Sequence, residues 1–342
     1  MKILFIGKIK GNSRLTYQTI KEIYKETEFI DINKIFKYKI FYIIFYHLSP
    51  EFFNLYIFYF FKKKIKKKYD LIYINNCEFI NRSSIRLMKK KSDKIYFYCE
   101  DNPFVSRDKK RWKLTTKCFD LFDLVIFHQR NRLKYIKEYN IKKYIVIIPP
   151  YFNKLVNNIK KKKNQDIVFI GTWFPERGKF FYELKKMGLK FKIYGLRWDQ
   201  DRRYFNILKK NIILKGINLK NVMKIYKNSK ISIGLLSKGN DDDITRRCIE
   251  IPISKSLLCS EETETLKDLF IENKEAVYFR NSKECYEKCN LLLKNSKLLN
   301  RISINGFKKV KTTLKLDANK IFKKILNPKF INELKKPLIK KF

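Results

Sequence analysis

Histidine and paired cysteines are scarce in this sequence of 342 residues. It has only two histidines, His47 and His128, and its seven cysteines include no C-x-x-C pair. Because a structural zinc site needs four such ligands at characteristic spacing, the sequence argues against one and predicts no metal. An odd number of cysteines without this spacing is typical of free, buried thiols in a reducing cytosol.

The sequence also lacks an apolar run long enough to cross a bilayer. Its most apolar stretch, 40–61, is interrupted near the middle by Ser49, Pro50 and Glu51. Neither half reaches the ~18 apolar residues that a membrane span needs. The stretch therefore predicts two core helices that meet at Ser49-Pro50, with Pro50 at a helix start.

A basic run at 62–68 follows this apolar stretch. It can be interpreted as a solvated helix end or as an interfacial contact with an anionic membrane. A strand pattern begins at Lys2, so no signal peptide is expected. These features predict a cytoplasmic protein, with a peripheral position at the inner face of the cell membrane as the alternative.

Acidic residues are few, since 33 Asp and Glu stand against 78 Lys and Arg, a formal net charge of +45. Such a charge is typical of proteins that bind nucleic acid or anionic membranes. The lysines are spread along the chain, however, and Lys, Ile, Asn, Phe and Tyr are all frequent while Gly (10) and Pro (8) are rare. This joint bias indicates A/T-rich coding instead. In either case the field raises the local concentration of phosphate-bearing substrates.

Strand-like and helical segments alternate along the chain, which predicts an α/β fold with parallel sheets. The expected strands are 2–6, 28–30, 71–74, 95–98, 124–127 and 144–148 in the first half, and 166–171, 190–194, 212–215, 231–235, 256–259 and 276–279 in the second. A polar, lysine-rich stretch at 157–165 separates the two series. The predicted architecture is two Rossmann-like domains, 1–155 and 164–315, followed by a C-terminal helix or tail at 316–342.

The most informative motif lies between residues 240 and 279. Its characteristic positions are Thr245, Arg246, Arg247, Glu250, Ile251, Pro252, Phe270, Glu275 and Phe279. Their order and spacing resemble the C-terminal domain of group 1 glycosyltransferases, in particular the spore-maturation CgeB-like branch. The resemblance implies the GT-B fold, in which the two Rossmann-like domains face each other across a cleft.

Two further segments resemble the same family. Residues 168–177 are similar to the opening strand and loop of its donor-binding domain, and residues 100–104 to its D-D-P-F element. The family has a glycine where this chain has Lys255. A lysine there either offers charge to a phosphate or marks a weakened donor site.

The resemblance implies a nucleotide-sugar donor site in the second domain, the acceptor side being the first. The predicted donor-binding residues are Gly171, Thr172, Arg177, Lys179, Thr245, Arg247 and Glu250. Arg177 and Lys179 stand between a strand end and a helix start, where cations and backbone N–H groups together hold phosphates. Glu250 matches the second acid of the family's paired-acid element, which grips the ribose hydroxyls. The alternative is that Arg177 and Lys179 are ordinary solvated cations.

The three candidate catalytic residues are Asp242, Glu100 and Asp101. Asp242 precedes Glu250 by eight residues, where the family's first acid contacts the transferred sugar, and Asp241 and Asp243 are its rivals. Glu100 and Asp101 follow an expected strand and are predicted to orient the acceptor or act as a base. The alternatives are helix-capping charge for the three aspartates and a simple turn for Glu100 and Asp101.

These observations predict a glycosyltransferase, of the retaining type, that uses a nucleotide sugar as co-substrate and needs no cofactor. The acceptor would be a glycan, a lipid-linked saccharide or a protein, with no specific nucleic acid as partner. Two alternatives remain. One is an inactive GT-B scaffold that binds nucleotide or saccharide, and the other is a basic protein that binds nucleic acid or membranes.

Overall fold

The computed structural model describes residues 1–108, 110–156, 164–327 and 329–330, and it divides the chain into two compact units. Unit 1 comprises 1–148, 237–242 and the C-terminal segment from Ala318, and unit 2 comprises 149–236 and 243–317. The predicted boundaries placed 1–155 and 164–315 in the two domains and left 316–342 as a separate tail. The compact units divide at 148 instead, and the C-terminal helix belongs to unit 1.

Unit 1 is built on six parallel strands in the order β2-β1-β3-β4-β5-β6. They are β1 (Ile3–Gly7), β2 (Thr27–Asp31), β3 (Leu71–Asn75), β4 (Ile95–Cys99), β5 (Leu124–Phe127) and β6 (Tyr144–Val146). The central strands are buried along their whole length, as continuous apolar runs in parallel sheets are.

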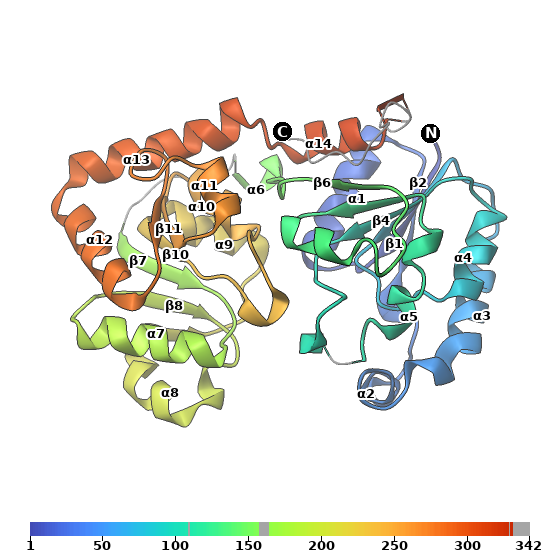
Figure 1. Cartoon of the computed structure of the whole chain (residues 1–342), viewed down its shortest axis with the longest axis horizontal. Helices are drawn as coiled ribbons and strands as arrows, with labels where there is room; N and C mark the ends of the chain where they lie inside the picture. The colour runs from blue at the N-terminus through green and yellow to red at the C-terminus, as the bar shows by residue number, and fades with distance from the viewer. Residues whose placement is uncertain (109, 157–163, 328, 331–342) are drawn as a thin grey trace. The chain divides into compact units, whose positions relative to one another are not determined.

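Helices cover both faces of this sheet (Figure 1). They are α1 (Gly11–Ile23), α2 (Lys39–His47), α3 (Asn54–Lys64), α4 (Arg82–Lys89), α5 (Lys113–Thr116) and α14 (Ala318–Ile325). α14 packs beside α1, and its Phe322 is fully buried against the rings of Tyr73 and Tyr98. The last described helix therefore completes the core of the first unit.

Unit 2 repeats the architecture with the strand order β12-β11-β10-β7-β8-β9, again all parallel. Its strands are β7 (Gln165–Ile170), β8 (Lys192–Gly195), β9 (Ile212–Leu214), β10 (Ser229–Gly234), β11 (Leu257–Glu261) and β12 (Val277–Phe279). Its helices are α6 (Asn153–Val156), α7 (Pro175–Lys186), α8 (Arg202–Leu208), α9 (Leu219–Lys227), α10 (Arg247–Ile253), α11 (Glu264–Leu269), α12 (Ser282–Lys294) and α13 (Ser296–Lys308).

Side-chain caps start several of these helices where the sequence places Asn or Thr. Asn81, Asn218, Thr263 and Asn281 each accept a hydrogen bond from a backbone N–H in the first turn of the helix that follows. The predicted fold class, α/β with two Rossmann-like sheets, is confirmed.

The helices around Ser49-Pro50 differ from the prediction in one respect. Pro50 does begin a short helix, the 3-10 turn Pro50–Phe53 between α2 and α3. Both helices do contribute to the core, since Phe45, Ile57 and Phe61 are buried. The prediction of two core helices was wrong for their outer sides, where many apolar side chains are exposed. None of the described helices is long and apolar enough to cross a membrane.

Candidate active site

The loop between β7 and α7 carries the first predicted donor-binding residues, Gly171 and Thr172. The carbonyl oxygen of Gly171 accepts a 2.8 Å hydrogen bond from Trp198 Nε1. A Cβ on Gly195 would lie 2.0 Å from the same oxygen, so the ends of β7 and β8 approach each other closely. α7 then begins at Pro175, whose fixed φ and missing N–H suit the first helical position. The fold thus holds the loop at both ends.

Arg177 is buried within unit 2, with its side chain only 3% exposed. Its guanidinium donates hydrogen bonds to the carbonyl oxygens of Thr172 (2.7 Å), Leu236 (3.2 Å) and Leu235 (3.5 Å). It also lies 4.6 Å from the ring centroid of Phe174. Because Leu235 and Leu236 follow β10, Arg177 ties the loop after β7 to the loop after its neighbouring strand. The predicted contact of Arg177 with a pyrophosphate stays a prediction.

Lys179 follows the buried residues Arg177 and Gly178 on α7 and is exposed. Its side chain is 70% exposed, and its Nζ lies 3.9 Å from Glu183 Oε1 in a surface ion pair. Such a pair contributes little to stability and leaves the ammonium group able to turn toward an anion. The predicted contact of Lys179 with a phosphate stays a prediction.

The other predicted donor-binding residues lie on or beside α10. Glu250 is buried, and Arg247 and Thr245 are partly exposed. Burial raises the pKa of the Tyr226 hydroxyl on α9, the positive charge of Arg247 opposes this and the charge of Glu250 adds to it. Arg247 and Glu250 therefore both lie close enough to the Tyr226 hydroxyl to act on it electrostatically. Among the described residues, the Arg247 side chain has no hydrogen-bond or ion-pair partner.

Lys255 has a backbone conformation that explains the family's glycine at this position. It lies directly after the C-cap of α10 with φ +60, in the left-handed region that glycine enters most readily. Its Nζ lies 4.7 Å from the ring centroid of Phe307, and its carbonyl oxygen accepts a 2.7 Å hydrogen bond from Ser303. The turn thus favours glycine at this position. Lys255 adopts the same conformation with some strain, and its ammonium group lies over the ring of Phe307.

The candidate acid Asp242 belongs to unit 1. Its Oδ1 accepts hydrogen bonds from Gln129 (2.7 Å), from Arg132 (3.4 Å) and from the side-chain amide of Asn240. The carboxylate side chain is only 8% exposed. Asp242 therefore anchors the segment 237–242, and its predicted contact with the transferred sugar stays a prediction.

The rest of this segment is held as firmly. The backbone N–H of Asn102 donates to Asn240 Oδ1 (3.1 Å), and its side-chain amide donates to the Asn240 carbonyl oxygen (3.2 Å). Asp241 forms a 2.9 Å ion pair with Lys134. The third aspartate, Asp243, lies in unit 2, where its Oδ2 accepts a hydrogen bond from Thr265.

Glu100 and Asp101 lie at the carboxyl end of β4, as predicted. Asn76, at φ 48, follows β3 and accepts hydrogen bonds from both of their backbone N–H groups, at 3.1 and 3.0 Å. Its side-chain amide donates to the Asp101 carboxylate (2.9 Å), and Arg107 lies 3.8 Å from the same group. Asn76 thus orders the turn that presents the two acids, whose catalytic roles stay predictions.

A buried carboxylate at the same edge of unit 1 escaped the sequence analysis. Glu78 is fully buried, and its Oε1 accepts hydrogen bonds from Lys8 (2.9 Å), Arg111 (3.0 Å) and the Tyr46 hydroxyl (3.0 Å). Burial alone would raise the pKa of Glu78, but the charges of Lys8 and Arg111 outweigh it and lower the pKa below its ordinary value. The one available signal was a carboxylate two residues beyond Asn76, after an expected strand.

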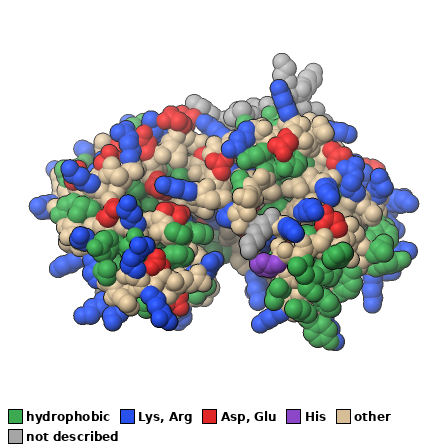
Figure 2. Space-filling view, turned by 60° about the horizontal axis from the view of Figure 1, so that its bottom comes forward, with side chains coloured by type: hydrophobic (Ala, Val, Ile, Leu, Met, Phe, Trp, Pro, Cys, Tyr) green, Lys and Arg blue, Asp and Glu red, His purple; other side chains and the backbone are tan. Residues whose placement is uncertain are grey.

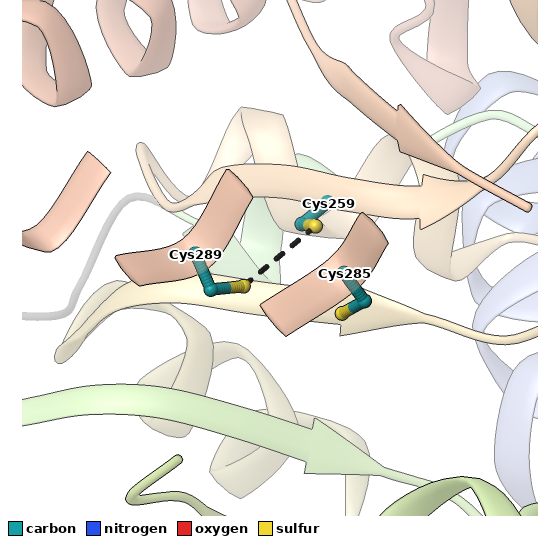
Figure 3. Close-up of side chains that lie close together, drawn as sticks. All are labelled: Cys259, Cys285 and Cys289. Carbon is teal, nitrogen blue, oxygen red and sulfur yellow. Dashed lines mark hydrogen bonds between the residues drawn. The ribbon is translucent and has the colours of Figure 1, made fainter. Parts of the chain in front are cut away.

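Three cysteines lie together in the core of unit 2 (Figure 3). Cys259 of β11 faces Cys285 and Cys289 of α12, with all three sulfur atoms within 4.8 Å of one another and all three side chains buried. The sulfurs of Cys259 and Cys289 are 3.9 Å apart, so they are thiols in contact. Structural zinc takes four ligands and this group has three members, and the predicted absence of a metal stays a prediction.

Comparison with known proteins connects this architecture to sugar transfer. Residues 177–319 match the family model described as glycosyl transferase-like. No curated protein sequence matches the chain.

Three solved structures illustrate the likeness in fold. Sucrose-phosphate synthase from Thermosynechococcus elongatus has 10% identity and a TM-score of 0.71, over 97% of this chain and 100% of that one. HepE from Anabaena, solved with UDP-glucose, has 12% identity and a TM-score of 0.70, over 95% and 98%. TarM from S. aureus has 19% identity and a TM-score of 0.60, over 81% of this chain and 58% of its own.

At these identities the likeness shows the fold, which is that of GT-B glycosyltransferases. The matched region and the fold together support the predicted enzyme class, a glycosyltransferase. Neither finding confirms the CgeB-like branch.

Arg177→Ala should destabilise the chain in the absence of any ligand. The substitution leaves three backbone carbonyl groups without their charged donor, which costs about 3 kcal/mol in the free energy of unfolding. Lys179→Ala, on the same helix but exposed, should change it by less than about 0.5 kcal/mol. Chemical unfolding followed by tryptophan fluorescence measures both, since Trp173 and Trp198 lie in unit 2. An Arg177→Ala chain as stable as the wild type would contradict this structural role.

Substitutions of Lys255 should separate backbone strain from side-chain contact. Lys255→Gly relieves the left-handed strain but loses the ring contact, so we expect a change between zero and about 1 kcal/mol of stabilisation. Lys255→Val places a β-branched residue at positive φ and should destabilise by more than about 1 kcal/mol. Thermal unfolding of the variants gives this order, and a glycine variant less stable than the valine variant would refute it.

Proposed function

We propose that this chain transfers a glycosyl group from a nucleotide-sugar donor, held by unit 2, to a glycan, lipid-linked or protein acceptor. One observation carries the proposal: the glycosyl transferase-like region, residues 177–319, contains α10, which holds the buried carboxylate Glu250 and, with no side-chain partner among the described residues, the cation Arg247. The fold relative HepE, solved with UDP-glucose and with UDP, supports a nucleoside diphosphate sugar as the donor.

The proposed chemistry needs positive charge where the diphosphate leaves. Cleavage of the bond between sugar and diphosphate builds positive charge on the sugar ring and negative charge on the departing phosphate. Arg247 has its donors available within the described chain, and Lys179 is exposed and weakly paired. We therefore assign the task to these two cations and not to Arg177, whose guanidinium is bound to backbone carbonyls.

Glu250 is proposed to accept hydrogen bonds from the ribose hydroxyls. A buried carboxylate is costly unless it is partnered, and hydroxyl donors of a bound nucleotide add to whatever partners the fold supplies. Since cationic side chains can neutralise the leaving group, the proposal requires no metal. By the paired-acid resemblance we further propose that the configuration at the sugar is retained.

A thermal-shift screen tests the proposal directly. In EDTA, the chain is mixed with UDP-, GDP-, ADP- and dTDP-glucose, and a donor at 100 times its Kd should stabilise it by about 2.7 kcal/mol. Glu250→Ala should abolish this shift. Glu264→Ala, on α11 with its side chain 86% exposed, is the matched control and should keep it.

Two results would contradict the proposal. One is the absence of a shift with any of the four donors, and the other is an undiminished shift in a folded Glu250→Ala variant. Binding without any release of nucleoside diphosphate in the presence of glycan and lipid-linked acceptors would favour the inactive scaffold instead.

A further inference from the structure

A large apolar surface is exposed on unit 1. We call it the α2–α3 surface, and its members are Tyr38, Ile40, Phe41, Ile43, Leu48, Phe52, Leu55, Tyr56 and Tyr59. These nine make up more than half of the seventeen exposed large hydrophobic side chains in the described residues, although they lie within 38–59. Figure 2 shows hydrophobic side chains gathered at the lower right of that view. Soluble monomers rarely expose so many together without a binding role.

The helices that carry this surface are firmly attached to unit 1. Phe45 of α2, and Ile57 and Phe61 of α3, are fully buried in the core. Beneath them Phe36 stacks with Tyr56 and lies 4.7 Å, centroid to centroid, from Phe53. The buried side chains therefore attach both helices to the core of unit 1. The exposed apolar side chains on the outer sides are available to a partner outside the chain.

The most prominent side chains lie at the junction of the helices. Phe52 is 79% exposed, Leu55 is 73% exposed and Leu48 is 60% exposed. Two tyrosines, Tyr56 and Tyr59, are about half exposed beside them. The Tyr56 hydroxyl donates a 2.8 Å hydrogen bond to the Ile35 carbonyl oxygen. Aliphatic and phenylalanine side chains together with tyrosines are a composition typical of the membrane–water interface.

Positive charge borders the surface on both sides in sequence. Lys37 precedes it, Lys39 follows its first member Tyr38, and the exposed run Lys62–Lys64 ends α3. Their long alkyl chains can lie along apolar groups while the ammonium groups reach anionic headgroups.

The single acid within 38–59 does not offset this charge. Glu51 forms ion pairs with Lys113 (2.8 Å) and Lys117 (3.2 Å). Partial burial opposes its ionisation, but the hydrogen bonds from Lys113 and Ser49 prevail and lower the pKa of Glu51 to about 2. Glu51 is therefore ionised at physiological pH, and the two lysines balance its negative charge.

We propose that the α2–α3 surface docks onto the interface of an anionic bilayer. Since no described helix can span a membrane, the contact is interfacial, with the apolar side chains inserted among the headgroups. A second copy of this chain is a poor occupant, because a symmetric contact would bring the same lysines face to face. The inference rests on the surface alone and is independent of the donor site, and with the proposed function it favours a lipid-linked acceptor.

Vesicle flotation tests the proposal on the full chain without any nucleotide sugar. The wild type should float with phosphatidylcholine vesicles containing 30% phosphatidylglycerol and bind pure phosphatidylcholine at least tenfold more weakly. Phe52→Ser with Leu55→Ser should weaken binding to the anionic vesicles at least tenfold. Lys62→Gln with Lys63→Gln should weaken it several-fold and reduce its dependence on salt.

Matched controls come from unit 2. Leu291→Ser with Ile304→Ser removes two exposed apolar side chains outside the surface, and Lys294→Gln with Lys297→Gln removes two lysines. Both control variants should bind like the wild type. Because Phe52 and Leu55 are largely exposed, their variant should keep the wild-type thermal unfolding midpoint.

Four results would overturn the proposal, and the first three concern vesicles and oligomeric state. They are no binding to anionic vesicles, equal loss of binding in the test and control variants, and a wild-type dimer that the Phe52 and Leu55 changes convert to a monomer. RNA binding that these two changes abolish while vesicle binding persists would likewise assign the surface to another partner. Failure of vesicle binding would leave the nucleotide-sugar thermal shift unaffected, so the two proposals fail separately.

Discussion

Arg177 ties together the loops that follow two neighbouring strands of unit 2, and the arrangement of the candidate donor site depends on this interaction. Its guanidinium bonds to carbonyl oxygens after β7 and after β10. Hydrogen bonds from a charged donor contribute about 1.5–3 kcal/mol each, and a buried carbonyl left without a donor costs a similar amount. The loop after β7 leads to Lys179, and the chain after β10 leads to α10 with Arg247 and Glu250. One buried cation therefore fixes the starting points of both segments that carry the proposed donor-binding groups.

A second constraint acts on the chain between β10 and α10. Residues 237–242 belong to unit 1, where Asn102 binds Asn240, and Gln129 and Arg132 bind Asp242. The two acids that the sequence motif places eight residues apart are consequently held by different units, Asp242 by unit 1 and Glu250 by unit 2. Asp242 and Glu250 are therefore close in sequence but are held in place by contacts in different units.

The fold could be predicted from the sequence because the central strands of unit 1 are continuous apolar runs buried on both faces. β1 and β3 have every residue buried, and such runs are visible without any knowledge of their neighbours. The position of α14 could not be predicted, since an amphipathic helix does not specify which unit it covers. The sequence also did not decide whether α2 and α3 are core helices or leave apolar side chains exposed, because the apolar stretch and its basic end are compatible with both.

The sequence predicted the candidate site only in part. Patterns located Glu100, Asp101, Arg177 and Glu250 at strand ends and helix starts, where ligand-binding residues of α/β proteins lie. They could not show that the Arg177 guanidinium is bound to carbonyl groups or that Glu78 holds Lys8 and Arg111, because these partners are far apart in sequence. At Lys255, the structure supplied a backbone reason for a departure that the sequence left open.

The central claim is that the strand-end loops of unit 2 hold the donor. Hydrogen–deuterium exchange of the full chain, with and without the strongest binder among UDP-, GDP-, ADP- and dTDP-glucose, tests it most directly. The account predicts slower exchange on binding in peptides that cover 171–179 and 245–253. Protection confined to unit 1, with both of these segments exchanging as in the free chain, would contradict it.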